Sequence, residues 1–363
     1  MMKIVFDNIV FGLQRAGGIS VVWQELLQYL QNKGLQDMQF IDVDNDKVDN
    51  YNRKKLKIAE DHQVDIIQHP KLVRYLPVRT RSDSPFIFHS SYYRYCTHPN
   101  AINVTTVHDL TYELFVKGIK QKMHTWQKFS AIRHSAAVAC ISENTKRDLL
   151  RLMPDVDERK VTVIYNGVSE VYQILDKDSR ECHLPFPSKS YVVFIGRRDD
   201  YKNFGLTVKG VAATDLNLLI VGSQLNEEEK RMVEEYLPPT RYKCLGHVFD
   251  AALNAFYNYA AALVYPSSYE GFGLPVLEAQ RAGCPVIAYH ASSIPEVIGN
   301  TPLLMNELSE EELVRKLRLL SDSDMMKQVR ADGLANSRRF SWEAMGNGYL
   351  KLYQQLWSAA RKA

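Results

Sequence analysis

The chain has 363 residues, of which 45% are hydrophobic and 24% charged, and its formal net charge at pH 7 is +3. This length is enough for two domains of ordinary size, each with its own core, and the small net charge argues against a nucleic-acid-binding protein. No apolar run approaches the roughly 18 residues of a membrane span, and residues 1–6 lead directly into Asp7, unlike a signal peptide, so we expect a cytoplasmic protein. The cysteines are odd in number, widely spaced and without a C-x-x-C pair, which favours buried thiols over a disulfide framework or a zinc site. They are Cys96, Cys140, Cys182, Cys244 and Cys284.

The N-terminal half alternates predicted strands with helical stretches. A first strand is predicted at 3–6, and after Gly17 and Gly18 the apolar residues repeat at helical spacing up to Gly34. Gly17 and Gly18 either let a substrate approach the backbone or form a turn that needs a positive φ. Further strands are predicted at 38–43, 86–89, 102–107, 136–141 and 161–165. This alternation is typical of a parallel sheet covered by helices on both faces.

Two motifs of this half carry ionisable side chains at strand ends. His108 and Asp109 follow the strand predicted at 102–107, and ligands of parallel sheets bind at the carboxyl ends of the strands. The alternative is a histidine satisfied by local hydrogen bonds. Asp42-Val43-Asp44 imitates a metal-binding D-x-D motif, but such triplets arise easily at this charge content, and 155–157 is another. We therefore expect no metal site.

The periodic pattern breaks down at 172–189, which we interpret as an interdomain linker. A second series then begins with a strand at 191–195. Arg197 and Lys202 lie in the loop that leaves this strand, where an arginine can hold a phosphate bidentately and a lysine adds a flexible charge. The alternatives are two solvated side chains, or a role for the neighbouring Arg198. Further strands are predicted at 216–221, 242–245 and 262–265, with helices at 226–236 and 250–260.

The segment from Glu270 to Glu278 follows the strand at 262–265 and reads as loop and then helix. Gly271 and Gly273 allow the backbone to approach a ligand closely, and Pro275 suits the first turn of a helix. Amides and the positive end of the helix dipole would then face an anion above the loop. The two glutamates are slightly over two helical turns apart. The segment predicts a phosphate pocket with hydroxyls around it; the alternative is an ordinary Gly-Pro turn.

The stretch 266–279, followed by 282–287, resembles the E-x7-E signature of retaining nucleotide-sugar glycosyltransferases with the GT-B fold, that is, glycosyltransferase family 4, or glycosyl transferases group 1. The strand-Gly-Arg-x4-Lys pattern from Gly196, the stretch 292–297, the glycine pair and the His-Asp pair are similar to motifs of the same family. The stretch 106–110 resembles the corresponding pattern of bacterial polysaccharide mannosyltransferases.

This resemblance implies an α/β protein of the GT-B class, with two Rossmann-like domains whose parallel sheets face a central cleft. Residues 1–171 would form the acceptor domain, completed by a C-terminal helix at 341–363. Residues 190–340 would form the nucleotide-sugar-binding domain. The implied activity is transfer of a sugar, as by a hexosyltransferase, from a nucleoside diphosphate sugar to an acceptor hydroxyl with retention of configuration.

The resemblance also implies a part for each motif. Glu270 would hold hydroxyls of the donor sugar with His108 beside it, and Glu278 would accept hydrogen bonds from the ribose. The diphosphate would be bound by Arg197, Lys202 and the main chain of Gly271, Phe272, Gly273 and Leu274, with Gly17 and Gly18 also close to the donor. No cofactor and no metal are expected, because the nucleoside diphosphate sugar is a substrate; GDP is favoured over UDP. The alternatives are a nucleotide-sugar epimerase of the same fold and an inactive nucleotide-sugar-binding subunit.

The stretch 115–133 combines basic and large apolar residues. At helical spacing it either rests on anionic lipid or forms a solvated basic face. We therefore hypothesise a saccharide or lipid-linked saccharide acceptor and an enzyme in peripheral contact with the inner face of the membrane. The residues concerned are Lys117, Lys120, Lys122, Lys128 and Arg133, with Phe115, Met123, Trp126 and Phe129.

Overall fold

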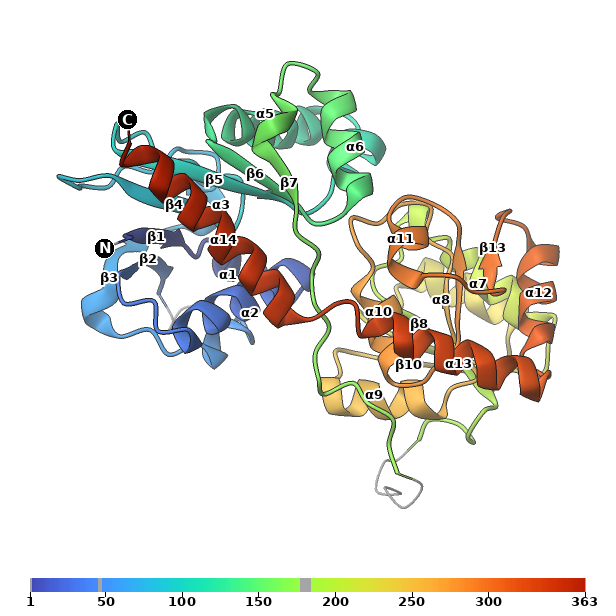
Figure 1. The fold of residues 1–363 in the computed structure, drawn as a ribbon. Helices are drawn as coiled ribbons and strands as arrows, with labels where there is room; N and C mark the ends of the chain where they lie inside the picture. The colour runs from blue at the N-terminus through green and yellow to red at the C-terminus, as the bar shows by residue number, and fades with distance from the viewer. Residues whose placement is uncertain (1, 45–47, 177–183, 363) are drawn as a thin grey trace. The chain divides into compact units, whose positions relative to one another are not determined.

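The structure, a computed structural model, describes residues 2–44, 48–176 and 184–362 (Figure 1). The chain forms two compact units. The first contains Met1–Gly167 together with Ser341–Ala363, and the second contains Val168–Phe340. Of the stretch expected to be a linker, residues 177–183 lie outside the described residues, whereas Tyr172 is buried and its hydroxyl donates a hydrogen bond to Asp250 (3.2 Å).

The first unit is built on a seven-stranded parallel sheet with the order β3-β2-β1-β4-β5-β6-β7. Every residue of β1 is buried, as expected for a central strand with helices on both faces. The prediction missed β3, where only Ile67 is buried, so the strand lacks an apolar pattern. The strands are β1 Ile4–Asp7, β2 Met38–Val43, β3 Gln63–Ile67, β4 Phe86–Ser90, β5 Ala101–Val107, β6 Ala137–Cys140 and β7 Val161–Val163.

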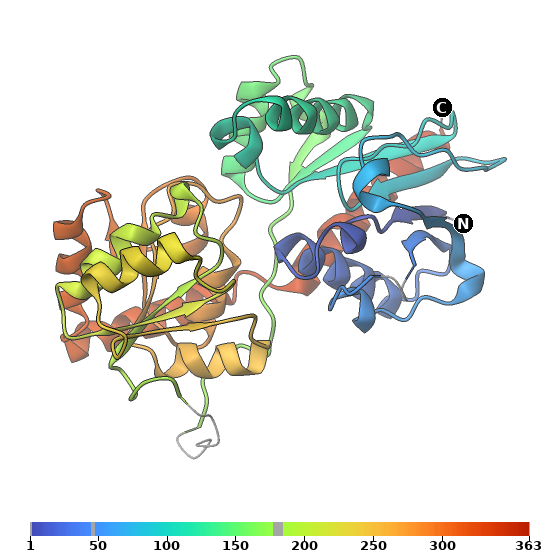
Figure 2. The ribbon, with the colours of Figure 1, turned by 180° about the vertical axis from the view of Figure 1, so that it is seen from behind.

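Helices cover both faces of this sheet, with α5 on one face and α2 and α14 on the other (Figures 1 and 2). Gly346 allows α14 to lie close to α2, because a Cβ there would come within 2.2 Å of the Tyr29 ring. The helices are α1 Val10–Leu13, α2 Gly18–Asn32, α3 Pro70–Val73, α4 Thr111–Phe115, α5 Ile119–His134, α6 Glu143–Leu152 and α14 Trp342–Ala360, with 3-10 turns at Arg53–Lys55, Glu60–His62 and Glu158–Lys160.

A buried polar cluster fastens α14 to the sheet. Tyr353 shares a hydrogen bond with Nδ1 of His89 (2.6 Å), and Thr106 shares one with Nε2 of His89 (2.9 Å) and another with Tyr349 (2.9 Å). Burial, with a smaller contribution from His108, lowers the pKa of His89 to about 3, so this histidine is neutral and its polar atoms are paired. The last helix is therefore part of the core of the first unit.

The second unit contains a six-stranded parallel sheet with the order β10-β9-β8-β11-β12-β13. Its core is formed by apolar side chains of the strands and of α7, α12 and α13, such as Val192, Val208 and Leu313. The elements are β8 Tyr191–Ile195, β9 Asn217–Val221, β10 Tyr242–Leu245, β11 Ala262–Tyr265, β12 Val286–Tyr289 and β13 Leu304–Met305, with α7 Phe204–Ala212, α8 Glu227–Tyr236, α9 Asp250–Tyr259, α10 Leu274–Arg281, α11 Ile294–Ile298, α12 Glu310–Leu319, α13 Ser323–Ser337 and a 3-10 turn at Asp200–Lys202.

In both sheets the strand order reverses beside the first strand, between β1 and β4 in the first unit and between β8 and β11 in the second. Doubly wound sheets bind ligands outside the carboxyl ends of the strands at such a switch point. In the second unit, the loops that leave β8 and β11 hold the motifs at 196–202 and 270–278. The topology therefore brings these two motifs to one edge.

Two expectations from composition can be compared with the structure. Cys96, Cys140 and Cys284 are buried free thiols as predicted, whereas Cys244 is only half-buried; Cys182 lies outside the described residues. In the part of the chain that the structure describes, no helix has both the length and the apolar character needed to cross a bilayer.

Candidate active site

Lys202 and Glu270 meet at the carboxyl edge of the second sheet. The Lys202 ammonium donates a hydrogen bond to Oε1 of Glu270, and the two side chains are only 13% and 12% exposed. The ammonium also lies 5.4 Å from the centroid of the Tyr265 ring at the end of β11. Burial, and then the charge of Glu270, raises the pKa of the Tyr265 hydroxyl far above its usual range. The pair thus places a cation and an anion side by side in a site of restricted solvent access.

The loops that carry this pair are bonded to each other. Asn203, in a left-handed conformation (φ 53°), donates through Nδ2 to the Pro266 carbonyl (2.8 Å) and the Ser268 hydroxyl (2.9 Å). The Ser268 amide donates in return to the Tyr201 carbonyl (2.7 Å). Such bonds hold Lys202 and Glu270 on a common frame.

A third loop holds the main chain of Glu270. The Glu270 amide donates to the Ser292 hydroxyl (2.8 Å), and the Ser293 hydroxyl contacts the carbonyls of Glu270 and Phe272, both at 2.9 Å. Ser292 has a φ of 51°, a backbone conformation that costs energy in a residue other than glycine and is concentrated at functional sites. Ser292 and Ser293 were not predicted as site residues, although the match of 292–297 to the family pattern was the available signal.

Gly273 turns the chain into α10. Its φ is 107°, which a side chain would strain, and a Cβ would meet Ile294 at 3.0 Å. No side chain caps the N-terminus of α10, where Leu274 and Pro275 begin the helix, so the positive end of the helix dipole is directed out of this turn. Phe272 is 3% exposed and packs its ring on Phe340, so only its main chain can face a ligand.

Glu278 lies in the second turn of α10, half-buried beside α9. Burial, and then the charge of Asp250, raises the pKa of Glu278 to about 8, while the Tyr257 hydroxyl opposes this rise. The carboxyl group is therefore mostly protonated at neutral pH in the free protein, and a neutral carboxyl can donate as well as accept a hydrogen bond. Asp250 and Tyr257 were missed from the sequence, because only the packing of α9 on α10 brings them here.

The two arginines after β8 have different environments. The Arg197 side chain is 81% exposed and contacts Asp199 (3.0 Å). Arg198 is only 3% exposed; it pairs with Glu229 through two bonds of 2.8 and 2.9 Å and donates to two carbonyls of the loop after β9. Arg198 thus fixes one loop to the next, and Arg197 remains the candidate for the diphosphate.

In the first unit, His108 and Asp109 follow β5. Burial lowers the pKa of His108 to about 4; Asp109 opposes the shift and Lys128 adds to it, so His108 is neutral at pH 7. Burial alone would raise the pKa of Asp109, but Lys128 and hydrogen bonds from Thr111 bring it below its usual value. The pair is therefore a neutral imidazole beside a carboxylate.

Lys128 is not the surface cation that the sequence predicted. Its side chain is fully buried, and its ammonium donates to the Asp109 carbonyl (2.8 Å) and to the Glu113 carboxylate (2.7 Å). It also lies 5.0 Å from the centroid of the Tyr93 ring. Lys128 therefore supports the end of β5, and the hypothesis that it meets lipid is wrong, because the sequence shows its charge but not its burial.

The remaining candidates of the first unit can be placed as well. Gly17 is extended (φ 161°), and neither it nor Gly18 adopts the left-handed backbone conformation, so the glycine pair does not form the expected left-handed turn. Gly17 instead provides room, since a Cβ would lie 2.2 Å from the Gln14 amide oxygen, and α2 begins at Gly18 without a side-chain cap. Asp42 of the apparent D-x-D motif is fully buried and paired with Arg53 (2.6 Å), which gives it a structural role.

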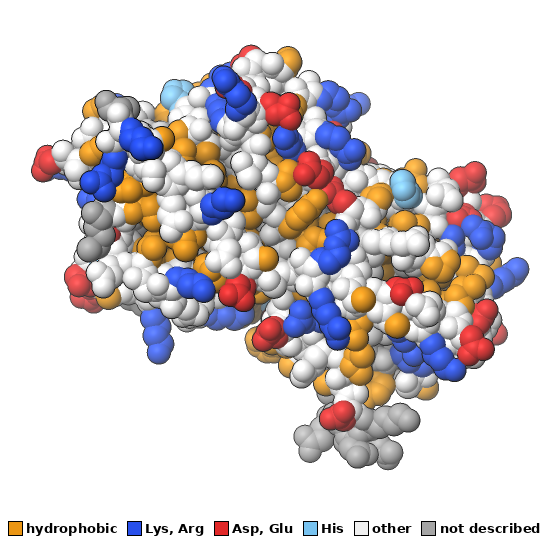
Figure 3. All heavy atoms as spheres, in the orientation of Figure 1, with side chains coloured by type: hydrophobic (Ala, Val, Ile, Leu, Met, Phe, Trp, Pro, Cys, Tyr) orange, Lys and Arg blue, Asp and Glu red, His pale blue; other side chains and the backbone are white. Residues whose placement is uncertain are grey.

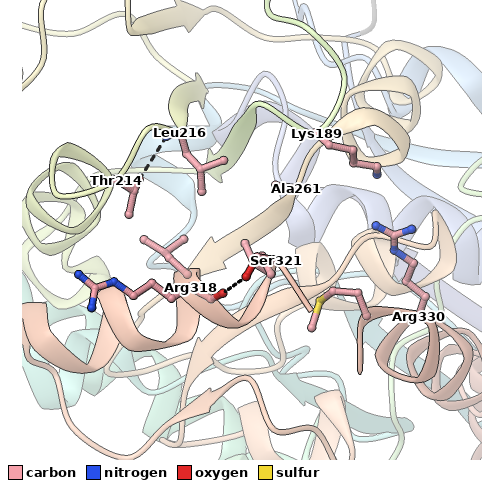
Figure 4. A pocket seen from close by; sticks show the side chains of 10 residues that line it. Lys189, Thr214, Leu216, Ala261, Arg318, Ser321 and Arg330 are labelled. Atoms are coloured by element: carbon pink, nitrogen blue, oxygen red, sulfur yellow. Dashed lines mark hydrogen bonds between the residues drawn. The ribbon is translucent and has the colours of Figure 1, made fainter. Parts of the chain in front are cut away.

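Within the described ranges 2–44, 48–176 and 184–362, no group of three or more His, Cys, Asp or Glu side chains is arranged to hold a metal ion. A cavity of about 440 Å³ does occur in the second unit (Figure 4). Lys189, Leu216 and Ala261 line this cavity. Each lies one or two residues before a strand, so the cavity is at the amino edge of the sheet. None of the candidate site residues lines this cavity.

Comparison with known proteins gave matches over most of the chain. The family described as Glycosyl transferases group 1 matches residues 176–334, and Glycosyltransferase Family 4 matches residues 16–171. The O-antigen chain mannosyltransferase B of Escherichia coli is 26% identical over 301 residues, which cover 76% of each chain. The serotype-specific mannosyltransferase WbdA of Escherichia coli is 24% identical over 231 residues, 59% of this chain but only 28% of that protein.

Solved structures resemble the whole chain. Sucrose-phosphate synthase from Thermosynechococcus elongatus superimposes with a TM-score of 0.76 at 20% identity, covering 99% of this chain and 100% of the other. Anabaena Alr3699/HepE, in complex with UDP and glucose, gives a TM-score of 0.70 at 15% identity and covers 98% and 100%. At these identities the likeness concerns the fold, and the expected α/β architecture of two parallel sheets is confirmed.

Proposed function

Because the chain belongs to the group 1 glycosyltransferases with the GT-B fold and is itself a glycosyltransferase, we propose that it transfers a sugar from a nucleoside diphosphate sugar to an acceptor hydroxyl with retention of configuration, in the synthesis of a cell-surface polysaccharide. The observation that carries the proposal is the Lys202–Glu270 pair at the switch point of the second sheet. It is flanked by the exposed Arg197 and by the uncapped N-terminus of α10.

The diphosphate is bound by these positive groups. An ammonium has three N–H donors, so Lys202 can keep its bond to Glu270 and still donate to a phosphate oxygen. Arg197 adds a planar guanidinium that can bind phosphate bidentately, and the helix N-terminus offers main-chain amides. Positive charge placed in advance stabilises the diphosphate most strongly as it leaves, which lowers the barrier to transfer.

Glu270 holds the donor sugar. Its carboxylate accepts hydrogen bonds from sugar hydroxyls, and its position is fixed by Lys202 at the side chain and by Ser292 and Ser293 at the main chain. In the first unit, His108 is neutral at pH 7, so its imidazole can donate or accept a hydrogen bond without adding charge. Glu278 binds the ribose hydroxyls, and this contact is equal before and during the reaction.

The acceptor oxygen attacks C1 of the sugar on the face that the diphosphate leaves. The bond from C1 to the phosphate oxygen breaks, the bond from C1 to the acceptor oxygen forms, and the acceptor proton passes to the leaving phosphate. This sequence retains the anomeric configuration and needs no covalent enzyme intermediate. The protein contributes positioning and charge stabilisation.

We propose GDP-mannose as the donor, with a saccharide or lipid-linked saccharide as the acceptor. The support is the likeness to the O-antigen chain mannosyltransferase B of Escherichia coli, whereas the UDP in the Anabaena structure favours UDP. A thermal-shift series with GDP, UDP, ADP and dTDP separates these, since a ligand at about 100 times its dissociation constant adds roughly 2.7 kcal/mol of stability. Stabilisation by UDP and not by GDP would exclude GDP-mannose.

Transfer itself is tested by incubating the protein with the stabilising nucleotide's sugar and saccharide acceptors, and by reading the anomeric configuration of the product by NMR. We expect a glycoside with the configuration of the donor, formed about tenfold to a few hundredfold more slowly with Glu270→Gln. A product of inverted configuration would overturn the retaining mechanism. Release of an altered donor sugar without any glycoside would indicate an epimerase.

A further inference from the structure

Helix α5 presents a row of large apolar side chains to solvent. Ile119, Met123 and Trp126 follow one another at spacings of four and three residues, which places them on one face of the helix, and they are 76%, 46% and 62% exposed. Phe115, just before the helix, is 44% exposed. Single exposed apolar residues are ordinary, but a contiguous row marks an interaction surface.

A second segment extends this row. The Gln127 side chain donates to the Arg74 carbonyl, so the chain after α3 lies against α5. Leu76, which is 58% exposed, lines the same small hollow as Trp126. We call the set Leu76, Phe115, Ile119, Met123 and Trp126 the α5 face; its members come from the chain after α3 and from residues 115–126.

Lysines border the α5 face without acidic partners on the same segment. Lys117, Lys120 and Lys122 are exposed, and the acidic side chain in 111–134 is Glu113, which is buried and bound by Lys128. On the side drawn in Figure 3, basic and acidic side chains are interspersed. The α5 face therefore combines apolar surface with positive potential that its own segment does not neutralise.

We propose that the α5 face docks the protein on a lipid bilayer rich in anionic headgroups. Trp126, Met123 and Ile119 enter the boundary between headgroups and acyl chains, where an amphipathic helix lies in the plane of the membrane. The lysines stay at the level of the anionic headgroups, which attract each of them. This inference rests on the proposed function for its purpose, which is to bring the enzyme to a lipid-linked acceptor.

The test is co-sedimentation with vesicles of phosphatidylglycerol and phosphatidylcholine, compared with phosphatidylcholine alone, at low and high salt. We expect binding to the anionic vesicles, weaker binding at high salt, and a blue shift of tryptophan fluorescence that is lost in Trp126→Phe. Lys120→Glu with Lys122→Glu should weaken binding at least 25-fold, from about fivefold for each charge removed. Ile119→Gln with Trp126→Gln should weaken it similarly.

Matched controls distinguish docking through the α5 face from general electrostatic attraction and from nonspecific hydrophobic adsorption. Lys351→Glu with Lys362→Glu changes two exposed lysines of the same unit, and Ile66→Gln removes an exposed apolar side chain from β3 (48% exposed). Both should bind vesicles like the unchanged protein. Equal loss of binding in these controls, or no binding by the unchanged protein at low salt, would overturn the proposal.

The outcomes also separate this inference from the proposed function. The α5-face variants should keep their circular dichroism, their stabilisation by nucleotide and their transfer to a water-soluble acceptor. Vesicle binding without transfer to any acceptor would contradict the proposed function and still support the docking inference. Concentration-dependent self-association that the α5-face variants abolish, with no vesicle binding, would identify a second copy of the chain as the occupant and overturn docking on lipid.

Discussion

Replacing Glu278 by glutamine should change how the stability of the second unit depends on pH. The folded protein raises the pKa of Glu278 from 4.5 to about 8, chiefly by burial. A raised pKa means that the folded state binds the proton more tightly than the unfolded chain does. The stability that this proton contributes is therefore fully present below about pH 4.5 and is lost as the pH rises through about 8.

The size of the effect follows from the same pKa. At about 1.36 kcal/mol per pH unit, roughly 3 kcal/mol is lost by pH 7 and roughly 4–5 kcal/mol by pH 9, as upper estimates. Glu278→Gln keeps a neutral side chain at every pH and so escapes this loss. The variant should match the unchanged protein near pH 5 and exceed it increasingly toward pH 9.

The assay is urea unfolding between pH 5 and 9, followed by circular dichroism and by tryptophan fluorescence. All four tryptophans belong to the first unit, so fluorescence serves as an internal control in which the two proteins should agree: Trp23, Trp126, Trp342 and Trp357. Glu307→Gln, at an exposed carboxylate of the second unit, is the matched control. Parallel pH profiles for Glu278→Gln and the unchanged protein would refute the burial of Glu278 as the cause.

Three further predictions concern the site. Glu278→Gln should mainly raise the donor KM, by about two- to tenfold, because the neutral carboxyl makes hydrogen bonds of roughly 0.5–1.5 kcal/mol. Glu270→Gln should instead lower kcat and the single-turnover rate by about tenfold to a few hundredfold, for a bond to a charged group of roughly 1.5–3 kcal/mol, with nucleotide affinity nearly unchanged; loss of nucleotide affinity in Glu270→Gln with an intact single-turnover rate would reverse the two roles. EDTA should leave most of the transfer rate, because Arg197, Lys202 and the α10 N-terminus supply positive charge; abolition by EDTA with rescue by manganese or magnesium would contradict this. Arg197→Ala should weaken nucleoside diphosphate binding without loss of stability, whereas Arg198→Ala should cost roughly 1.5–3 kcal/mol of stability, because it removes the bonds from the buried guanidinium to Glu229 and to two carbonyls of the loop after β9; equal melting temperatures for the two variants would show that the arginines were assigned wrongly.

The parts of the site that the sequence predicts are those encoded locally. A turn into a helix is predicted by Gly271, Gly273 and Pro275 independently of the rest of the chain. The structure has this turn at 270–274. Ser292 and Asp250 reach the site only through tertiary packing. The family pattern at 292–297 includes Ser292 but does not reveal its contact with Glu270, and no local pattern marks Asp250. Lys128 was wrongly predicted to be exposed. A lysine in a basic stretch gives no sign that it pairs with a buried carboxylate.

The fold shows the same division. Apolar runs with turn signals predict the central strands, because burial on both faces leaves a continuous hydrophobic stretch. The edge strand β3 is mostly exposed, and its sequence Gln63-Val64-Asp65 gives no such stretch, so it is fixed by pairing with β2. Membership of 341–363 in the first unit was implied by the family resemblance and not by a local pattern, because it depends on contacts made far along the chain, such as Tyr353 to His89.

The return of α14 to the first unit has a consequence for the order of folding during synthesis. The chain leaves that unit at Gly167 and comes back at Ser341, so the whole second unit emerges from the ribosome before the first can be completed. Until then His89 and Thr106, on two central strands, lack the tyrosine side chains that cover them in the folded unit. Tyr353 is the hydrogen-bond partner of His89, and Tyr349 is that of Thr106. A nascent or truncated chain ending before residue 341 would therefore hold a complete second unit beside a first unit with an open sheet face, which is the state most exposed to chaperones and proteases.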